Sequence, residues 1–96
     1  MPKNTSAFLL QIITLCFDKK CDFNEIATLV YKAMSITPKE ASKFAIHMAR
    51  LSFEKEIDFN QIAAFAYKAM SITPKEASVF LFCMIRHSFE NDVSLN

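Results

Sequence analysis

The chain has 96 residues, enough for one domain with one core, since typical domains contain about 100 to 150 residues. Hydrophobic residues make up 52% of the sequence and glycine is absent, so we expect a domain this small to leave some apolar side chains uncovered. The 11 Lys and Arg residues are balanced by 10 Asp and Glu residues that are interspersed with them. This balance argues against a protein that binds nucleic acid through an overall basic surface.

A repeated string, YKAMSITPKEAS, occurs at 31–42 and again at 67–78, so that the two copies start 36 residues apart. The same shift aligns two sets of phenylalanines: Phe8, Phe44 and Phe80 form one set, and Phe17, Phe53 and Phe89 form the other. Internal repeats of about 20 to 50 residues indicate stacked supersecondary units. We therefore expect a single helical-repeat domain over 1–96, with repeat units at about 2–37, 38–73 and, incomplete, 74–96.

The first type of helix is expected to start at a proline, because Pro2, Pro38 and Pro74 share one repeat position. In the second copy Thr37 precedes the proline and Glu40 follows it, and the third copy repeats this order. Such an order predicts a capping box, in which the threonine hydroxyl accepts a hydrogen bond from the backbone N–H of the glutamate. Apolar residues at helical spacing then predict an amphipathic helix over 38–53, with Ala41, Phe44, Met48 and Leu51 on its inner face.

The second type of helix is expected to follow Asp22 and Asp58, which act as N-caps, with Glu25 or Gln61 three residues later. The residues predicted for its inner face are Phe23, Ile26, Ala27, Val30 and Met34 in one copy, and Phe59, Ile62, Ala63, Ala66 and Met70 in the other. Short connections force neighbouring helices to pack antiparallel. The sequence therefore predicts an all-α fold of five antiparallel helices in tandem hairpins with a 36-residue period, as a compact bundle or a short solenoid.

The first and last helices are expected to be apolar around most of their circumference, whereas the middle helix carries Lys43, His47 and Arg50 on its outer face. The end units of an isolated repeat array normally present a polar face to water. Either the ends therefore contact another molecule, or the terminal helices close into the core. The first reading predicts a homodimer or higher homo-oligomer, and the residues predicted to make the contact are Leu9, Leu10, Ile13, Val79, Phe82 and Ile85.

No set of residues indicates catalysis or metal binding. Cys16, Cys21 and Cys83 are odd in number, and the aligned positions of Cys16 and Cys83 carry Ser, His or Gln, which favours reduced thiols over zinc ligands. His47 and His87 stand at different repeat positions, without a carboxylate or serine that recurs beside either of them. We therefore expect no enzymatic activity and no cofactor.

The expected location is the cytoplasm, without membrane contact. The apolar run from Ala7 to Phe17 is not followed by a small-residue cleavage site, as a secretory signal peptide would be. This run is also far shorter than the roughly 20 residues that a transmembrane helix needs.

A second kind of candidate site is a repeated edge of cations near the helix junctions. Lys32, Lys39, Lys68 and Lys75 recur at equivalent positions, and Lys43 and Arg50 extend the set. Helix N-termini with lysines nearby can hold a phosphate or a carboxylate. This edge predicts, as an alternative function, a small nucleic-acid-binding regulator.

The repeat period and the paired helices resemble the tetratricopeptide and pentatricopeptide repeats in outline, although the sequence contains neither the Trp nor the Gly of the tetratricopeptide pattern. By analogy, this resemblance implies a scaffold that binds a partner. We hypothesise a small non-enzymatic protein–protein interaction module, acting as an adaptor, inhibitor or regulator on a protein partner of unknown identity. A further alternative is an inhibitor of a host protein that is encoded by a phage or another mobile element.

Overall fold

Five α-helices of 14 residues each make up most of the chain over 5–92, the residues that the structure, a computed structural model, describes. They are α1 (Thr5–Asp18), α2 (Phe23–Ile36), α3 (Ala41–Glu54), α4 (Phe59–Ile72) and α5 (Ala77–Glu90). Two short 3-10 helices, η1 (Pro38–Glu40) and η2 (Pro74–Glu76), precede α3 and α5. The predicted all-α class with five helices is confirmed, and no strand occurs between residues 5 and 92. The predicted helix start at Pro2 lies outside the described residues.

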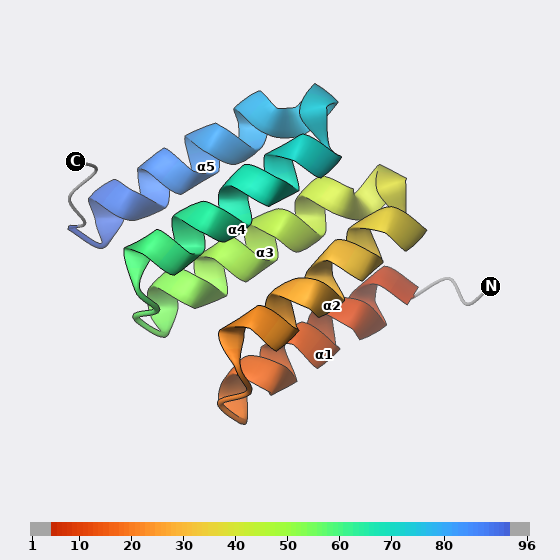
Figure 1. Cartoon of the computed structure of the whole chain (residues 1–96), viewed down its shortest axis with the longest axis horizontal. Coiled ribbons are helices and arrows are strands. Elements are labelled where there is room, and N and C mark those ends of the chain that lie inside the picture. Colours follow the sequence, from red (N-terminus) through yellow and green to blue (C-terminus); the bar gives the residue numbers. More distant parts are fainter. Residues whose placement is uncertain (1–4, 93–96) are drawn as a thin grey trace.

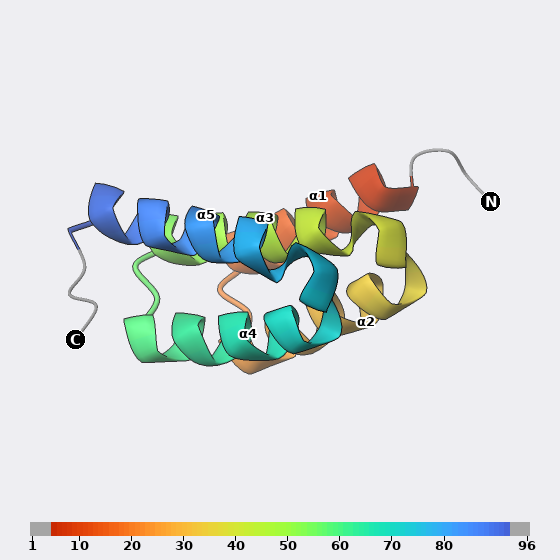
Figure 2. The same ribbon diagram turned by 90° about the horizontal axis from the view of Figure 1, so that it is seen from above.

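The helices form two layers, which are seen edge-on in Figure 2. One layer contains α1, α3 and α5 with α3 in the middle, and the other contains α2 and α4. The molecule is a slab with extents of 43 × 32 × 19 Å, and α1 and α5 lie at its opposite edges (Figure 1). In this arrangement α3 has a helix on each side within its own layer and both helices of the other layer beneath it.

The N-termini of α2 and α4 are capped by aspartates, as predicted. The Asp22 carboxylate accepts hydrogen bonds from the backbone N–H groups of Asn24 at 3.1 Å and Glu25 at 3.3 Å. The Asp58 carboxylate accepts one from the N–H of Asn60 at 3.1 Å. Each carboxylate satisfies N–H groups that have no partner within the helix.

The capping box predicted at Thr37 and Thr73 is wrong. The Thr37 hydroxyl donates backwards to the carbonyl of Ala33 at 2.7 Å, and the Thr73 hydroxyl donates to that of Ala69 at 3.1 Å. These two carbonyls, at the end of the preceding helix, also accept the backbone N–H groups of Thr37 and Thr73 at 3.0 Å, and their second lone pair accepts the hydroxyl. The Glu40 carboxylate instead pairs with Lys43 Nζ at 3.0 Å. As a result, 38–40 is a 3-10 turn, and the α-helix predicted over 38–53 spans Ala41–Glu54.

The core is centred on α3, whose predicted inner face is buried throughout. Ala45, Ala49 and Ser52, which lie beside that face, are also fully buried because neighbouring helices pack on both sides of α3. Within the layer of α2 and α4, the ring of Phe65 on α4 stacks on Tyr31 of α2, with 5.5 Å between the ring centroids. Phe65 also meets Phe80 of α5 edge-to-face at 6.3 Å, and this cluster holds α2, α4 and α5 together.

Three residues just beyond helix C-termini adopt the left-handed backbone region: Lys20 with φ 59°, Glu56 with φ 58° and Asp92 with φ 54°. After α1, the Cys21 N–H donates to the carbonyl of Cys16 at 3.0 Å, and the Ile57 N–H makes the corresponding bond to Ser52 after α3. These bonds are those of a Schellman motif, which normally places a glycine in the left-handed position. A residue with a Cβ atom costs about 1 kcal/mol more there.

Replacing Phe44 by Ala should lower the free energy of unfolding by about 3 to 5 kcal/mol, because the substitution leaves a cavity at the centre of the core. Phe8→Ala is the matched control, since Phe8 occupies the aligned position and is 62% exposed, and it should change stability by less than about 0.5 kcal/mol. Urea denaturation of dilute protein, followed by circular dichroism, measures both values. Similar losses for the two variants would contradict the burial described above.

Candidate interaction surface

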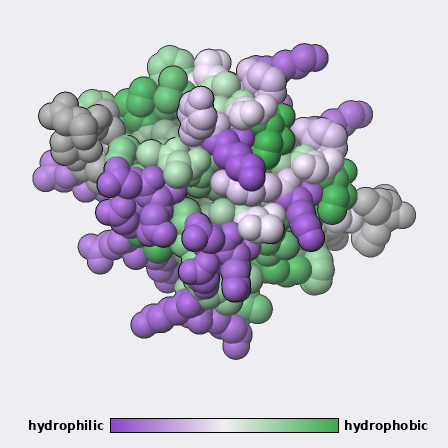
Figure 3. Space-filling view, in the orientation of Figure 1, coloured by the Kyte–Doolittle hydropathy of each residue, from purple (hydrophilic) through white to green (hydrophobic). Residues whose placement is uncertain are grey.

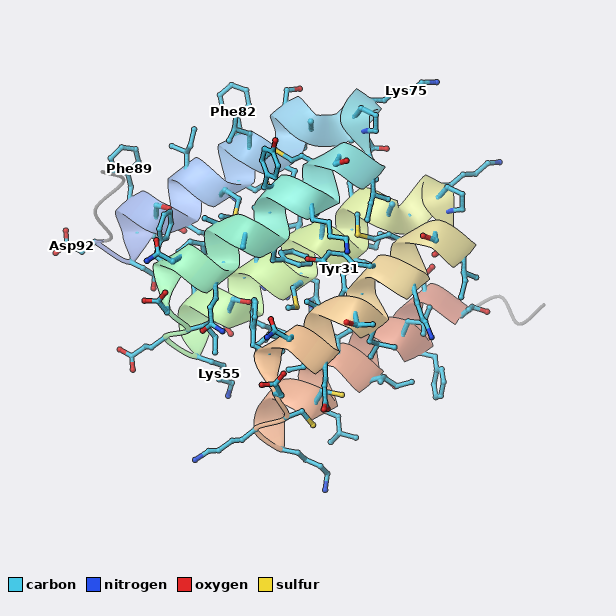
Figure 4. All side chains as sticks on the ribbon, in the orientation of Figure 1. Tyr31, Lys55, Lys75, Phe82, Phe89 and Asp92 are labelled. Carbon is cyan, nitrogen blue, oxygen red and sulfur yellow. The ribbon has the colours of Figure 1, made fainter. Side chains whose placement is uncertain are left out.

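The largest exposed apolar side chains of α5 lie along one edge of the slab. Phe82 and Phe89 are each 73% exposed and, in Figure 4, project from α5 away from the other helices. Val79 and Ile85 are exposed beside them. We call these four residues the α5 edge, and Figure 3 shows hydrophobic atoms gathered along the upper edge of the molecule over this helix. Contiguous exposed apolar surface on a small protein marks a contact site.

Among the residues predicted for self-association, Val79, Phe82 and Ile85 lie on this exposed edge. On α1 the prediction needs correction, because Ile13 is 0% exposed and belongs to the core. Leu9 and Leu10 are partly buried and pack against that core. The helix is apolar around its circumference, and α2 and α3 cover the side that carries Ile13.

Over 5–92, the predicted contact left out six exposed large apolar residues: Phe8 and Leu15 on α1, Leu81 and Phe89 on α5, Ile36 on α2 and Tyr67 on α4. Phe8 and Leu15 are seven residues apart and therefore share one face of α1. A signal for Phe8 and Phe89 was present in the repeat, since each belongs to a set of aligned phenylalanines. Periodicity identifies an apolar face, but it does not say whether a neighbour covers that face.

A groove between α4 and α5 adjoins the α5 edge and has a volume of about 220 Å³. Its lining is almost entirely apolar: Phe59, Ala63, Ala66, Tyr67, Met70, Leu81, Met84, Ile85 and Ser88. Thirty-six residues earlier, the aligned positions on α2 and α3 include Val30, Met34 and Met48, which are buried because α4 packs against both helices. On α2 and α3 the aligned surface therefore packs against a helix, whereas the α4/α5 groove has no helix against it within residues 5–92.

The predicted cation edge is divided among separate hollows. Lys68 lines a hollow between α2 and α4, whereas Lys43 and Arg50 line one formed with Leu10 on α1. Lys75 lines a third, at the end of the slab where η1 and η2 lie. Lys32 and Lys39 are exposed.

Half of these six cations have intramolecular partners. Lys68 Nζ lies 4.5 Å from the centre of the Tyr31 ring, which lies between α2 and α4 in Figure 4. Burial raises the pKa of the Tyr31 hydroxyl. Lys43 pairs with Glu40, and Arg50 Nη2 hydrogen-bonds to His47 Nδ1 at 3.0 Å. These contacts offset part of the positive charge offered to an anion.

His47 connects α3 to α1 through a defined tautomer. The Thr14 hydroxyl donates to the Leu10 carbonyl at 3.0 Å, so its oxygen accepts from His47 Nε2–H at 2.9 Å. This leaves Nδ1 free to accept from Arg50. Burial, followed by the nearby Arg50 charge, lowers the pKa of His47, while the Leu10 carbonyl and the Glu54 carboxylate act in the opposite direction.

His87 pairs with Glu90, with 3.4 Å between Nδ1 and Oε1. A histidine beside a carboxylate also occurs in catalytic sites. Here the imidazole packs against the Phe53 ring at 5.9 Å between centroids, so His87 links α5 to α3. His87 thus contributes to the packing of α5 on α3.

The cysteines of the described residues are unpaired: Cys16 and Cys83 are partly buried and Cys21 is exposed. Burial, and secondarily the neighbouring Cys21, raises the pKa of Cys16. Over 5–92, no group of three or more His, Cys, Asp or Glu residues is placed to hold a metal ion. In the same range, no helix is both long and apolar enough to cross a bilayer.

No protein-family model, curated protein or solved structure matches this chain.

The pKa of His47, measured by NMR titration, should lie below the usual value of about 6.5. Arg50→Gln should raise it, because the substitution removes a positive charge next to Nδ1. Arg86→Gln, at the aligned position on α5, is the matched control and should leave the pKa of His47 unchanged.

The same shift links stability to pH. The unfolded chain binds a proton at His47 more tightly than the folded chain does. The free energy of unfolding therefore contains a contribution from neutral His47 that is complete above about pH 6.5, the unfolded pKa, and is lost as the pH falls through the folded pKa. His47→Gln should therefore reduce the drop in urea midpoint between neutral and mildly acidic pH. An unchanged drop would contradict this account.

Proposed function

We propose that this chain is a small non-enzymatic protein–protein interaction module, acting as an adaptor, inhibitor or regulator, and that it self-associates through its terminal helices. The observation that carries the proposal is the α5 edge, where two phenylalanines are each 73% exposed beside further apolar residues. Phe8 and Leu15 give α1 exposed apolar residues as well.

The energetics of burial support this proposal. Full burial of a large apolar side chain contributes about 1.5 to 3 kcal/mol. Association of two proteins costs at least about 4 kcal/mol in lost translational and rotational freedom. Burial of Phe82 or Phe89 alone does not offset this cost, but burial of the whole α5 edge against a matching surface does. The contact is therefore expected to be weak to moderate in affinity and to depend on protein concentration.

The α4/α5 groove supports binding of a protein partner in addition to self-association. Its lining accepts the apolar face of an amphipathic helix, and the aligned surface of α2 and α3 already packs against one, α4. A partner helix with apolar residues at the spacing of Ile62, Phe65 and Ala66 fits the same geometry. We further propose a reducing location such as the cytoplasm, in keeping with three unpaired cysteines.

Self-association is tested by multi-angle light scattering across a concentration series. The mass of the wild-type protein should rise with concentration, and Phe82→Asp should shift this rise to at least about tenfold higher concentration, because a carboxylate cannot be buried unpaired at the contact. Ile36→Asp, which changes an exposed apolar residue at the end of α2, is the control and should behave as the wild type. A wild-type mass that stays monomeric at all concentrations would refute self-association.

A second candidate function is binding of nucleic acid, favoured by the hollow between α2 and α4 that Lys68 and Tyr31 line. If this function is real, a single-stranded oligonucleotide should bind, and its affinity should fall steeply with added salt. Lys68→Gln should weaken binding, whereas Lys55→Gln, which changes a lysine that lines a different hollow, should have a smaller effect. Fluorescence anisotropy measures this, and no binding at low salt would remove the candidate.

A further inference from the structure

The two edge helices carry surfaces that match each other. Resting on the proposed self-association, we infer that copies of this chain dock head to tail, with α1 of one copy packed beside the α5 edge of the next. This contact would extend the α1/α3/α5 layer from one molecule into its neighbour. The template is α3, which has α1 on one side and α5 on the other within a single chain.

Aligned phenylalanines show which side of each helix lacks a neighbour. Phe44 on α3 is 0% exposed, but its counterpart Phe8 on α1 is 62% exposed. Conversely, Phe53 on α3 is 5% exposed, and its counterpart Phe89 on α5 is 73% exposed. On α3 both phenylalanines are thus buried, whereas Phe8 is exposed on α1 and Phe89 is exposed on α5. A head-to-tail neighbour would cover both of them at one interface.

The packing inside the chain specifies the apolar contact. Phe53 on α3 packs against the His87 ring on α5, with 5.9 Å between centroids. The proposed contact between copies lies one 36-residue step further along the repeat. There Phe89 takes the position of Phe53, and Leu15 of the next copy takes the position of His87. Both of these residues are exposed in the single chain, so the equivalent contact is a phenylalanine ring against a leucine.

The charges along the two edges are complementary. Within the chain, Lys55 Nζ beyond α3 lies 3.4 Å from the Asp18 carboxylate at the end of α1. Two 36-residue steps along the repeat, at the α5/α1 contact between copies, Glu90 takes the position of Asp18, and Lys19 of the next copy takes the position of Lys55. An acidic group therefore again faces a basic one, as a docking surface requires.

A polar contact within the chain can be transferred to the contact between copies by the same repeat alignment. The Thr14 oxygen on α1 lies 2.9 Å from His47 Nε2 on α3. Two interfaces further along, at the contact between copies, Arg86 takes the place of Thr14, and Gln11 of the next copy takes the place of His47. A guanidinium donates well to a side-chain amide oxygen, so this pair also matches in chemistry.

Such a contact is heterologous, because it joins two different surfaces. It leaves one free edge on each end of an assembly, so assemblies grow beyond a dimer into open chains or close into rings. A two-fold pairing of α5 with α5 would instead stop at a dimer and leave Phe8 and Leu15 uncovered. The α5 edge shares Ile85 with the α4/α5 groove, whereas Tyr67 on α4 belongs to the groove alone and lies outside the proposed contact.

Two complementary variants test the inference. Leu15→Asp blocks the α1 surface and Phe89→Asp blocks the α5 edge, and each variant alone should remain monomeric where the wild type associates. When mixed in equal amounts, each variant still offers the one surface that the other lacks. Sedimentation velocity should therefore show a one-to-one heterodimer that does not grow further. Tyr67→Asp, with an exposed groove residue changed, should assemble like the wild type.

Charge reversal at two surface residues, Lys19 and Glu90, provides a second test of the head-to-tail contact. Lys19→Glu and Glu90→Lys should each weaken association by about two- to fivefold, and the double variant should recover it, because both partners of the pair are then reversed. Circular dichroism is the control that checks whether each variant is folded.

Other outcomes separate the inference from the proposed function. If Leu15→Asp associates like the wild type and Phe89→Asp does not, or if the mixed variants fail to pair, the head-to-tail arrangement is overturned while self-association survives. If the wild type never associates, both are overturned.

Discussion

The structure depends on the burial of α3, which is surrounded by all four other helices. Its side chains Phe44, Ala45, Met48 and Ala49 are all 0% exposed, and α3 contacts each of the other helices. Because these side chains are fully buried, the positions of α1 and α5 follow from how they cover α3. The same constraint leaves the outer sides of α1 and α5 without a neighbour, which is where the exposed phenylalanines lie.

Aligned positions of the repeated sequence carry similar side chains in different surroundings. This difference decides which of these side chains are buried and which are exposed at the surface. A phenylalanine that stabilises the core in the middle copy becomes exposed apolar surface at an edge. Natural repeat proteins usually avoid exposed apolar side chains at their ends by having polar end units. Here the apolar residues are retained at both edges, and at α5 they lie next to an apolar groove.

The helices were predictable because their signals are local. Asp22 and Asp58 precede apolar residues at helical spacing, and their carboxylates do cap the helices that follow. The Thr37 cap failed because its hydroxyl had a competing acceptor at the end of the preceding helix. Ile13 was misassigned to the surface because an apolar helix does not reveal which of its sides is covered. The division of the cations among separate hollows likewise depends on how the layers stack, which no single helix encodes.

The left-handed residues Lys20 and Glu56 have a consequence for how the chain folds. In a sequence without glycine, both hairpin connections adopt a backbone conformation that is intrinsically unfavourable for side chains with a Cβ atom. An isolated helix pair would gain too little contact area to outweigh this local penalty together with the entropy of ordering its residues. We therefore expect the five helices to fold and unfold as one cooperative unit.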